Sequence, residues 1–239
     1  MLCNPHNPLG KCYPASTIIA LMELCQRHEI HLFADEIYAL SVYPVPDEHA
    51  VPFTSILSLD TDKYIDPNYL HHLYGFSKDF AAGGIRVGCL TTRNAELRRA
   101  LAAVSPFGWS GGINEEVACC LLDKEYLDDF LPRSKERLRN NNVLVRKLLD
   151  ECGIGYAKGA NAGFFIWIDL RPWLPRPRLH RWDEDGEEAG WKAEDALTME
   201  LIQHGVFITN GKEMSAEEPG WYRLIFAQDE RFVREGIER

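Results

Sequence analysis

The segment that most constrains this chain runs from Tyr74 to Gly88 and reads YGFSKDFAAGGIRVG. It places Lys78 at the end of a short apolar run, and Arg86 follows eight residues later, after a pair of glycines. A lysine that forms an imine with an aldehyde must lose its proton near neutral pH, which burial and a nearby cation favour. A guanidinium holds a phosphate through two parallel hydrogen bonds. The spacing therefore fits a lysine that binds a cofactor aldehyde and an arginine that binds the cofactor's phosphate.

The composition argues against several other classes of protein. The chain of 239 residues carries a formal net charge of −10, so no nucleic-acid partner is expected. No window approaches the roughly 18 uninterrupted apolar residues of a membrane span, and the first residues do not resemble a signal peptide. The seven cysteines lack CxxC or zinc-ligand spacing. We therefore expect reduced, mostly buried thiols, no metal site, no membrane partner and a cytoplasmic protein.

Apolar periodicity predicts strands and helices that alternate in the first part of the chain and mix in the second. The expected strands cover residues 31–34, 71–77, 86–92, 163–169, 206–209 and 222–227. The expected helices cover residues 14–25, 95–104, 114–122, 126–152 and 193–204, and the chain ends within a further one. Residues 133–146 are rich in charge and asparagine, which favours a solvated helix between domains, and residues 173–190 are expected to form a loop with a solvated acidic run.

This order of elements predicts two domains. Alternating strands and helices at the front indicate an α/β layer over residues 1–125. The mixture at the back indicates a smaller α+β domain over residues 126–239, joined to the first by the long helix at about 126–152.

Polar side chains that follow neighbouring strands are the candidates for a site. In open α/β sheets ligands bind at the carboxyl ends of the strands, and Asp35 and Lys78 both lie at such ends. Taken alone, Asp35 also fits a helix-capping acid, Tyr38 an ordinary half-buried aromatic and Asn7 a turn residue. These residues by themselves leave both interpretations open.

Four motifs in sequence extend the comparison to nearly the whole chain: NPHNPLG from residue 4, ADEIY from residue 34, YGFSKD with GGIRVG, and EPGWYRLIFA from residue 218. Together they resemble the fold-type I enzymes of aminotransferase class I/II that depend on pyridoxal 5'-phosphate (PLP). Within these, the motifs are most similar to the branch of 1-aminocyclopropane-1-carboxylate (ACC) synthase. The resemblance implies an α/β fold: a partial PLP-binding large domain with a mixed, mainly parallel sheet, plus a smaller α+β C-terminal domain.

The resemblance also implies roles for the residues that bind the cofactor's ring. Lys78 would carry the internal aldimine and, once freed by substrate, shuttle the proton at the substrate's Cα. Asp35 would pair with the pyridine nitrogen and keep it protonated, so that the ring acts as an electron sink. Tyr38 and Asn7 would hydrogen-bond the ring's phenolic oxygen and help to set the pKa of the aldimine.

Phosphate and substrate contacts are implied in the same way. Arg86 would bind the phosphate, with Ser77 as a candidate second ligand. Many relatives have a serine three positions before the lysine, where this chain has Gly75, so either Ser77 or a backbone N–H takes its place, or phosphate binding is weakened. Arg223 would bind the substrate's α-carboxylate, although a strand-borne arginine also fits a salt-bridge partner.

A second departure lies at the front of the chain. Relatives carry a long segment before NPHNPLG that supplies sheet strands, a helix start for the phosphate and an aromatic residue stacked on the pyridine ring. None of these is recognisable in this sequence, so we expect an unpaired, largely apolar sheet edge, which favours aggregation.

Three functions follow as alternatives. The first is a PLP-dependent transformation of an amino acid by transamination, by elimination including C–S cleavage, or by ACC-type ring closure. The second is a truncated, catalytically incompetent remnant that acts at most as a dimerisation partner. A homodimer or a pair with a full-length relative is expected in either case. The third is an α/β binding module without PLP.

Overall fold

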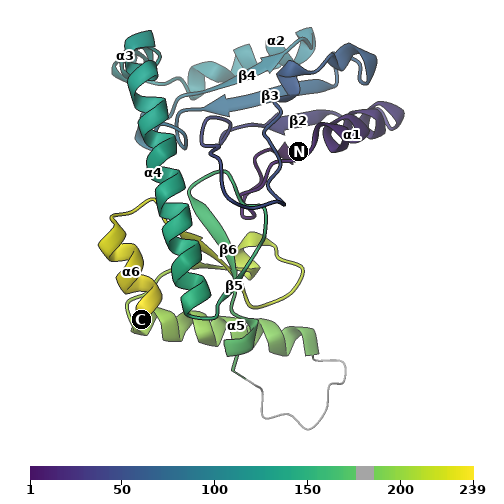
Figure 1. The fold of residues 1–239 in the computed structure, drawn as a ribbon. Helices are drawn as coiled ribbons and strands as arrows, with labels where there is room; N and C mark the ends of the chain where they lie inside the picture. The colour runs from purple at the N-terminus through teal and green to yellow at the C-terminus, as the bar shows by residue number, and fades with distance from the viewer. Residues whose placement is uncertain (176–185) are drawn as a thin grey trace. The chain divides into compact units, whose positions relative to one another are not determined.

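The computed structural model describes residues 1–175 and 186–239, which divide into two compact units (Figure 1). Unit 1 comprises Met1–Asn7, Lys11–Arg137 and Asn161–Gly163, and unit 2 comprises Pro8–Gly10, Leu138–Ala160 and Phe164–Arg239. Residues 176–185, which form the middle of the loop predicted at 173–190, lie outside the described residues.

Unit 1 is built on a sheet of four strands in the order β1-β2-β3-β4. The strands are β1 (Leu2–Cys3), β2 (Leu32–Asp35), β3 (Leu70–Gly75) and β4 (Gly88–Thr92). The first three are parallel and β4 runs antiparallel to β3. The prediction of a mixed, mainly parallel sheet is therefore confirmed, and within the described residues β1 and β4 form its edges.

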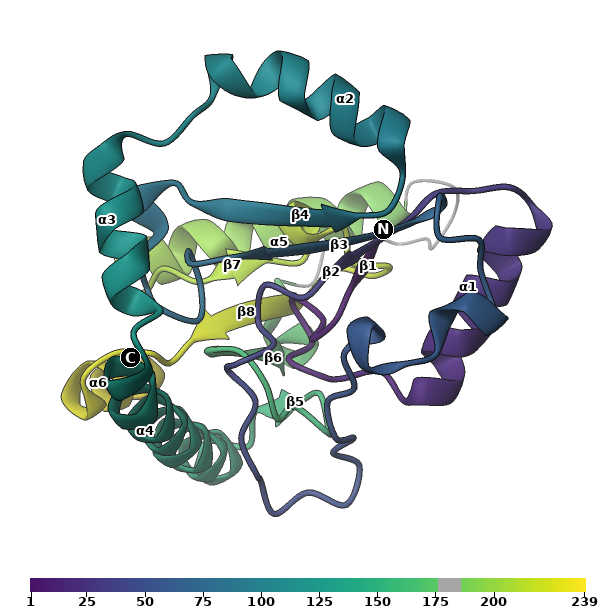
Figure 2. The same cartoon turned by 90° about the horizontal axis from the view of Figure 1, so that it is seen from above.

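Helix α1 (Ala15–Arg27) covers one side of this sheet, and α2 (Ala95–Val104) lies on the other side (Figure 2). Pro14 directly precedes α1, where its missing N–H and fixed φ favour a helix start. The helix then buries one apolar face against the first strands. The resulting core consists of Leu2, Ile18, Met22, Cys25, Leu32, Ala34, Ile56 and Ile65.

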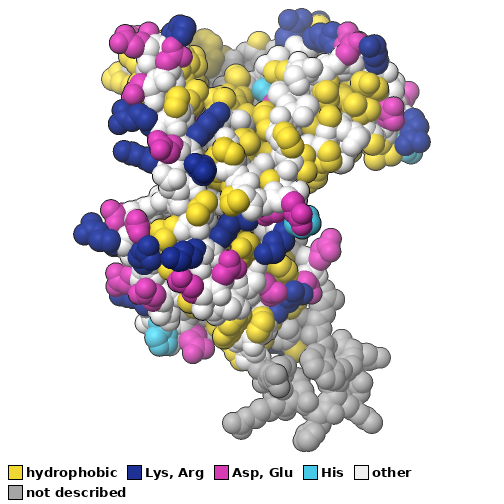
Figure 3. All heavy atoms as spheres, in the orientation of Figure 1, with side chains coloured by type: hydrophobic (Ala, Val, Ile, Leu, Met, Phe, Trp, Pro, Cys, Tyr) yellow, Lys and Arg dark blue, Asp and Glu magenta, His cyan; other side chains and the backbone are white. Residues whose placement is uncertain are grey.

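The remaining helices of unit 1, α3 (Gly112–Leu121) and the first part of α4 (Lys124–Glu151), pack against the turn that follows β3. Helix α3 packs Ala118 against Phe76 and Phe80. Helix α4 follows and contributes to both units. Figure 3 shows hydrophobic side chains at the surface around α3. The most exposed of those between residues 101 and 122 are Val104, Phe107, Trp109, Ile113 and Leu122.

Unit 2 is an antiparallel sheet with helices. Its strands, in the order β5-β6-β8-β7, are β5 (Gly155–Tyr156), β6 (Phe165–Asp169), β8 (Trp221–Ile225) and β7 (Thr209–Asn210). The helices α5 (Gly186–Gln203), α6 (Glu230–Glu238) and the second part of α4 belong to the same unit. Every side chain of β6 is buried except that of Asp169, which is intermediate.

Several expectations about individual elements are wrong. The strand predicted at 206–209 covers only Thr209–Asn210, and α5 begins at Gly186, inside the predicted loop. The segment predicted as a solvated helix at 133–146 is buried toward its end, at Asn142 and Arg146. The cysteines are all free, but the exposed ones outnumber the buried ones: Cys89, Cys119, Cys120 and Cys152 are exposed, Cys3 is intermediate, and Cys12 and Cys25 are buried.

The described residues contain neither a membrane-spanning helix nor a cluster of metal ligands. No helix among them is long and apolar enough to cross a membrane. No group of three or more His, Cys, Asp or Glu side chains among them is arranged to hold a metal ion.

Candidate functional site

Three of the predicted site residues follow the carboxyl ends of three neighbouring parallel strands. Asn7 lies in the turn after β1, Asp35 ends β2, and Lys78 lies in the turn after β3. Cys3 is in register with Asp35, and Asp35 is in register with Leu73, so the three strands end near one edge of the sheet. Ligands of open α/β sheets bind at this edge.

A pocket of about 440 Å³ lies at the same edge. Three predicted residues line it, namely Asp35 from β2 and Ser77 and Arg86 from the segment between β3 and β4. Its other lining residues are Ile37, Leu73, Tyr74, Gly75, Val87, Gly88, Cys89 and Leu90. The half-buried Lys78, the buried Tyr38 and the half-buried Asn7 lie outside this lining.

The pocket floor depends on a close approach of two glycines. Gly75 at the end of β3 is in register with Gly88 at the start of β4. A Cβ atom added at Gly75 would lie 3.3 Å from the carbonyl oxygen of Val87, which is tighter than ordinary van der Waals contact. The absence of the serine that relatives have at this position thus matches the narrow spacing of the two strands.

Arg86 reaches the pocket from a strained backbone. Its φ is 53°, in the left-handed region that a residue with a Cβ atom adopts at a cost. The exposed side chain donates from Nη1 to the carbonyl oxygen of Gly83 at 2.9 Å. The Gly83–Ile85 turn therefore positions the guanidinium that the sequence assigns to a phosphate.

The backbone around Asp35 is fixed by hydrogen bonds. Asp35 Oδ1 accepts from the N–H of Ile37 at 3.2 Å, which starts the turn over Ile37–Leu40. Tyr38 lies in this turn and is 4% exposed. On the other side, the backbone N–H of Asn4 donates to the carbonyl oxygen of Asp35 at 2.9 Å and ties the NPHNPLG turn to the end of β2.

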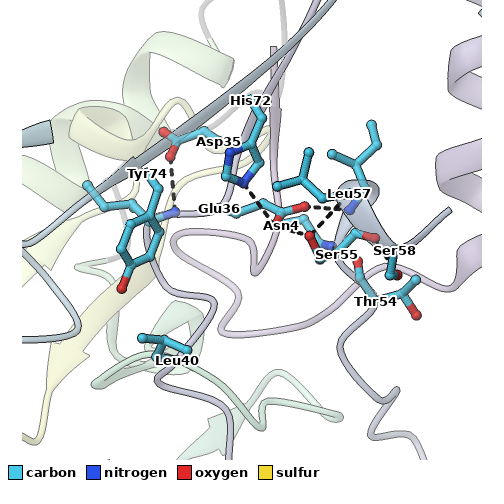
Figure 4. Close-up of polar contacts among 12 residues, drawn as sticks. Asn4, Asp35, Glu36, Leu40, Thr54, Ser55, Leu57, Ser58, His72 and Tyr74 are labelled. Atoms are coloured by element: carbon cyan, nitrogen blue, oxygen red, sulfur yellow. Dashed lines mark hydrogen bonds and ion pairs between the residues drawn. The ribbon is translucent and has the colours of Figure 1, made fainter. Parts of the chain in front are cut away.

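A buried carboxylate beside Asp35, which the sequence did not single out, holds this edge together (Figure 4). Glu36 is 2% exposed, and its Oε1 accepts from the N–H of Ile56 at 2.6 Å. Its Oε2 accepts from the Ser55 hydroxyl at 2.6 Å and lies 3.2 Å from Nε2 of His72 on β3. The sequence did contain one signal, which is that two acids, Asp35 and Glu36, stand together at the end of an apolar strand. An acid buried at that position needs hydrogen-bond donors around it.

Arg223 belongs to unit 2 and lies on β8. Its Nη2 donates to the Thr209 hydroxyl at 3.3 Å, and its guanidinium lies 5.6 Å from the centre of the Phe165 ring. These contacts orient the side chain within unit 2, and its predicted binding of a carboxylate stays a prediction.

The fold and this edge of the sheet are those of a known family. Residues 1–239 match the family described as aminotransferase class I and II, and the chain belongs to it. The predicted resemblance to its PLP-dependent, ACC synthase-like branch is confirmed.

Individual relatives support the same conclusion. The chain is 33% identical over its whole length to 1-aminocyclopropane-1-carboxylate synthase-like protein 1 of Takifugu rubripes, and it covers 36% of that protein. It is 32% identical, again over its whole length, to a mouse protein named probable inactive 1-aminocyclopropane-1-carboxylate synthase-like protein 2, of which it covers 38%. The chain thus spans less than half the length of these curated relatives.

A solved structure shows the same fold. Aspartate aminotransferase from Thermus thermophilus with maleate superposes with a TM-score of 0.78 at 23% identity, over 99% of this chain and 54% of that one. The predicted fold class, fold type I, is therefore confirmed.

The groups at the sheet edge fit PLP by their chemistry. Asp35, Ser77 and Arg86 line one pocket. There the carboxylate could pair with a protonated ring nitrogen, and the hydroxyl and the guanidinium are donors of the kind that a phosphate accepts from. Lys78 directly follows Ser77 in the turn after β3, and its side chain is not part of the lining.

Proposed function

We propose that this chain binds PLP at the carboxyl edge of the unit 1 sheet and transforms an amino acid at its Cα atom. The observation that carries the proposal is the convergence of Asn7, Asp35 and Lys78 at the ends of three parallel strands, beside a pocket lined by Ser77 and Arg86. Membership of the aminotransferase class I and II family supports the choice of cofactor.

Each residue has a definite task in this proposal. Lys78 would hold the cofactor through its aldehyde carbon and, once displaced by the substrate's amine, would move the proton at the substrate's Cα. Asp35 would keep a proton on the pyridine nitrogen, while Tyr38 and Asn7 would donate to the ring's phenolic oxygen. When bound, PLP supplies an electron sink for the negative charge that develops at Cα. Transamination, elimination and ACC-type ring closure all begin with the removal of this proton.

The test is a spectroscopic titration of the chain with PLP. Lysine-bound cofactor absorbs in the visible range, so the wild type should develop such a band and Lys78→Ala should not. Lys63→Ala is the matched control, because Lys63 is an exposed lysine of the same unit and forms a surface ion pair with Asp60. Borohydride reduction followed by peptide mass mapping should place the added mass on Lys78. A band that persists in Lys78→Ala would refute the assignment.

A second experiment addresses the branch of chemistry. If the band forms, incubation with a panel of amino acids should convert the cofactor to its amino form in a transaminase. A lyase should instead release product while the band returns. Whichever reaction occurs, Arg223→Ala should raise the substrate KM by orders of magnitude and leave cofactor binding nearly intact, whereas the exposed Arg231→Ala should change neither. Unchanged KM in Arg223→Ala would refute the carboxylate clamp.

Catalytic incompetence is the second candidate, favoured by one observation. The chain is as similar to a relative named probable inactive as to the ACC synthase-like protein 1, with 32% and 33% identity. In this case the folded chain would develop no visible band with PLP at millimolar concentration.

We also propose that the chain associates with a second copy of itself or with a longer relative. The exposed apolar side chains on and beside α3, including Phe107, Trp109 and Ile113, support an interface. Sedimentation of the wild type should show a dimer at micromolar concentration, and Trp109→Glu should shift it toward the monomer. A wild-type monomer at all concentrations, with no complex when a full-length relative is added, would refute this proposal.

A further inference from the structure

Asp79, the residue next to Lys78, is a buried carboxylate with no part in the proposed function. It is 4% exposed. Its Oδ1 accepts from the Ser41 hydroxyl at 2.5 Å, and its Oδ2 accepts from the Leu40 backbone N–H at 2.9 Å and from the Tyr74 hydroxyl at 3.0 Å. All of these residues belong to unit 1, so the contacts lie within one compact body.

Two of the three hydrogen bonds, from Leu40 and Ser41, connect segments that are far apart in the sequence, whereas Tyr74 lies on β3 just before the turn of Asp79. Leu40 ends the turn that contains Tyr38, whereas Asp79 belongs to the turn that contains Lys78. Asp79 and Leu40 are 39 positions apart. One carboxylate therefore fixes the turn of the predicted phenol donor against the turn of the predicted amine.

The surroundings of Asp79 are those of a structural group held by hydrogen bonds. The pKa of Asp79 is raised above its ordinary value, because burial outweighs the bonds from Ser41, Leu40 and Tyr74 and the positive charge of Lys135, which act in the opposite direction. Burial also raises the pKa of the Tyr74 phenol far above its usual value, so its hydroxyl keeps a proton to donate. The side chain of Asp79 is absent from the pocket lining, so its oxygens face the turns and not the pocket.

We propose that Asp79 is a positioning residue that holds Tyr38 in register with Lys78, and through this distance sets the proton affinity of the lysine nitrogen when PLP is bound. The inference rests on the proposed function for its chemical consequence, whereas the tether itself is a property of the protein alone. The Tyr38 hydroxyl would donate a hydrogen bond to the phenolic oxygen of PLP and so withdraw negative charge from that oxygen. The phenolic oxygen would then hold a proton on the Lys78 nitrogen less strongly. Loss of register should therefore raise the proton affinity of that nitrogen.

The first part of the test uses the protein without cofactor. Hydrogen exchange at the Leu40 amide, followed by NMR, should be faster in Asp79→Ala by about tenfold or more, because that amide loses its acceptor. Asp79→Asn should retain the protection. Its amide oxygen can accept from Leu40 and Tyr74, and its NH₂ group can donate to the Ser41 hydroxyl. Equal exchange rates in wild type and Asp79→Ala would overturn the tether.

The second part uses the PLP-loaded protein and follows the visible band against pH. The midpoint should rise by about half a unit or more in Asp79→Ala, and it should return close to the wild-type value in Asp79→Asn. A structural loss of stability alone would not move this midpoint. An equal shift in both variants would mean that Asp79 acts through its charge and would overturn positioning, as would the absence of any shift in Asp79→Ala.

Two milder variants replace Asp79→Ala if that variant does not fold, and a third variant serves as the control. If Asp79→Ala does not fold, Tyr74→Phe and Ser41→Ala each remove one donor, and together they should accelerate exchange at Leu40 and raise the midpoint. Asp128→Ala, an exposed aspartate on α4, should change neither readout. If the wild type forms no band, the proposed function fails, and the exchange rates still decide whether the tether exists.

Discussion

Replacement of Glu36 by alanine should be among the most destabilising single changes in unit 1. The variant removes the acceptor of three groups, which are the Ile56 N–H, the Ser55 hydroxyl and Nε2 of His72. Each buried donor that loses its acceptor costs about 1–3 kcal/mol, and water that enters the space satisfies part of this loss. We therefore expect a loss of about 3–5 kcal/mol of unfolding free energy.

Glu36→Gln separates charge from contact in this cluster. The glutamine keeps one carbonyl oxygen for the Ile56 N–H but presents an NH₂ group toward the other two partners. A smaller loss of about 1–2 kcal/mol is expected. The assay is urea unfolding by far-UV circular dichroism, with amide exchange at Ile56 as a local probe. Glu23→Ala, an exposed glutamate on α1, is the matched control and should stay within about 0.5 kcal/mol of wild type. A loss below about 1 kcal/mol in Glu36→Ala would refute the reasoning.

Three further predictions concern other parts of the chain. Hydrogen bonds and charge from Arg171 lower the pKa of Asp169 below its ordinary value of 3.8. Because Arg171 is 42% exposed, Arg171→Ala should cost only about 1 kcal/mol. This cost should be full above pH 3.8 and vanish as the pH falls through the lowered pKa, as measured by urea unfolding with tryptophan fluorescence. Gly75→Ser should lower stability by about 1–2 kcal/mol because its Cβ atom would crowd the Val87 carbonyl oxygen, and an unchanged urea midpoint would contradict this. A thiol reagent should label the native protein at the exposed cysteines, namely Cys89, Cys119, Cys120 and Cys152. The buried thiols should react only after denaturation, at Cys12, whose pKa burial raises to about 12, and at Cys25.

Helices and strands whose ends are marked by neighbouring residues, such as a capping side chain, could be predicted from the sequence. Helix α2 has the predicted bounds, Ala95–Val104, because Asn94 caps it by accepting from the N–H of Leu97. The strand predicted at 206–209 was misplaced, since β7 exists only where Thr209 and Asn210 pair with β8. Pairing of this kind depends on distant residues and leaves no local mark.

The candidate site also has features that the sequence predicted and contacts that it did not. The sequence was enough to predict that Asp35 and Lys78 follow two neighbouring strands, and the structure shows that these strands, β2 and β3, are parallel. The contacts of Glu36 and Asp79 were not predictable, because each carboxylate meets partners 19 to 39 positions away. The expectation of mostly buried cysteines failed because apolar character alone does not decide which face of α3 meets a core.

Two effects oppose each other at Arg86: the left-handed backbone favours glycine, whereas the proposed binding of a phosphate favours arginine. Glycine would adopt a φ of 53° without strain, and relief of that strain is worth on the order of 1 kcal/mol. A mutant library ranked only by melting temperature would thus enrich glycine at this position. One ranked by retention of a phosphorylated cofactor would keep arginine if its guanidinium binds the phosphate as proposed, so comparison of the two libraries would separate the cost of the backbone from the value of the side chain.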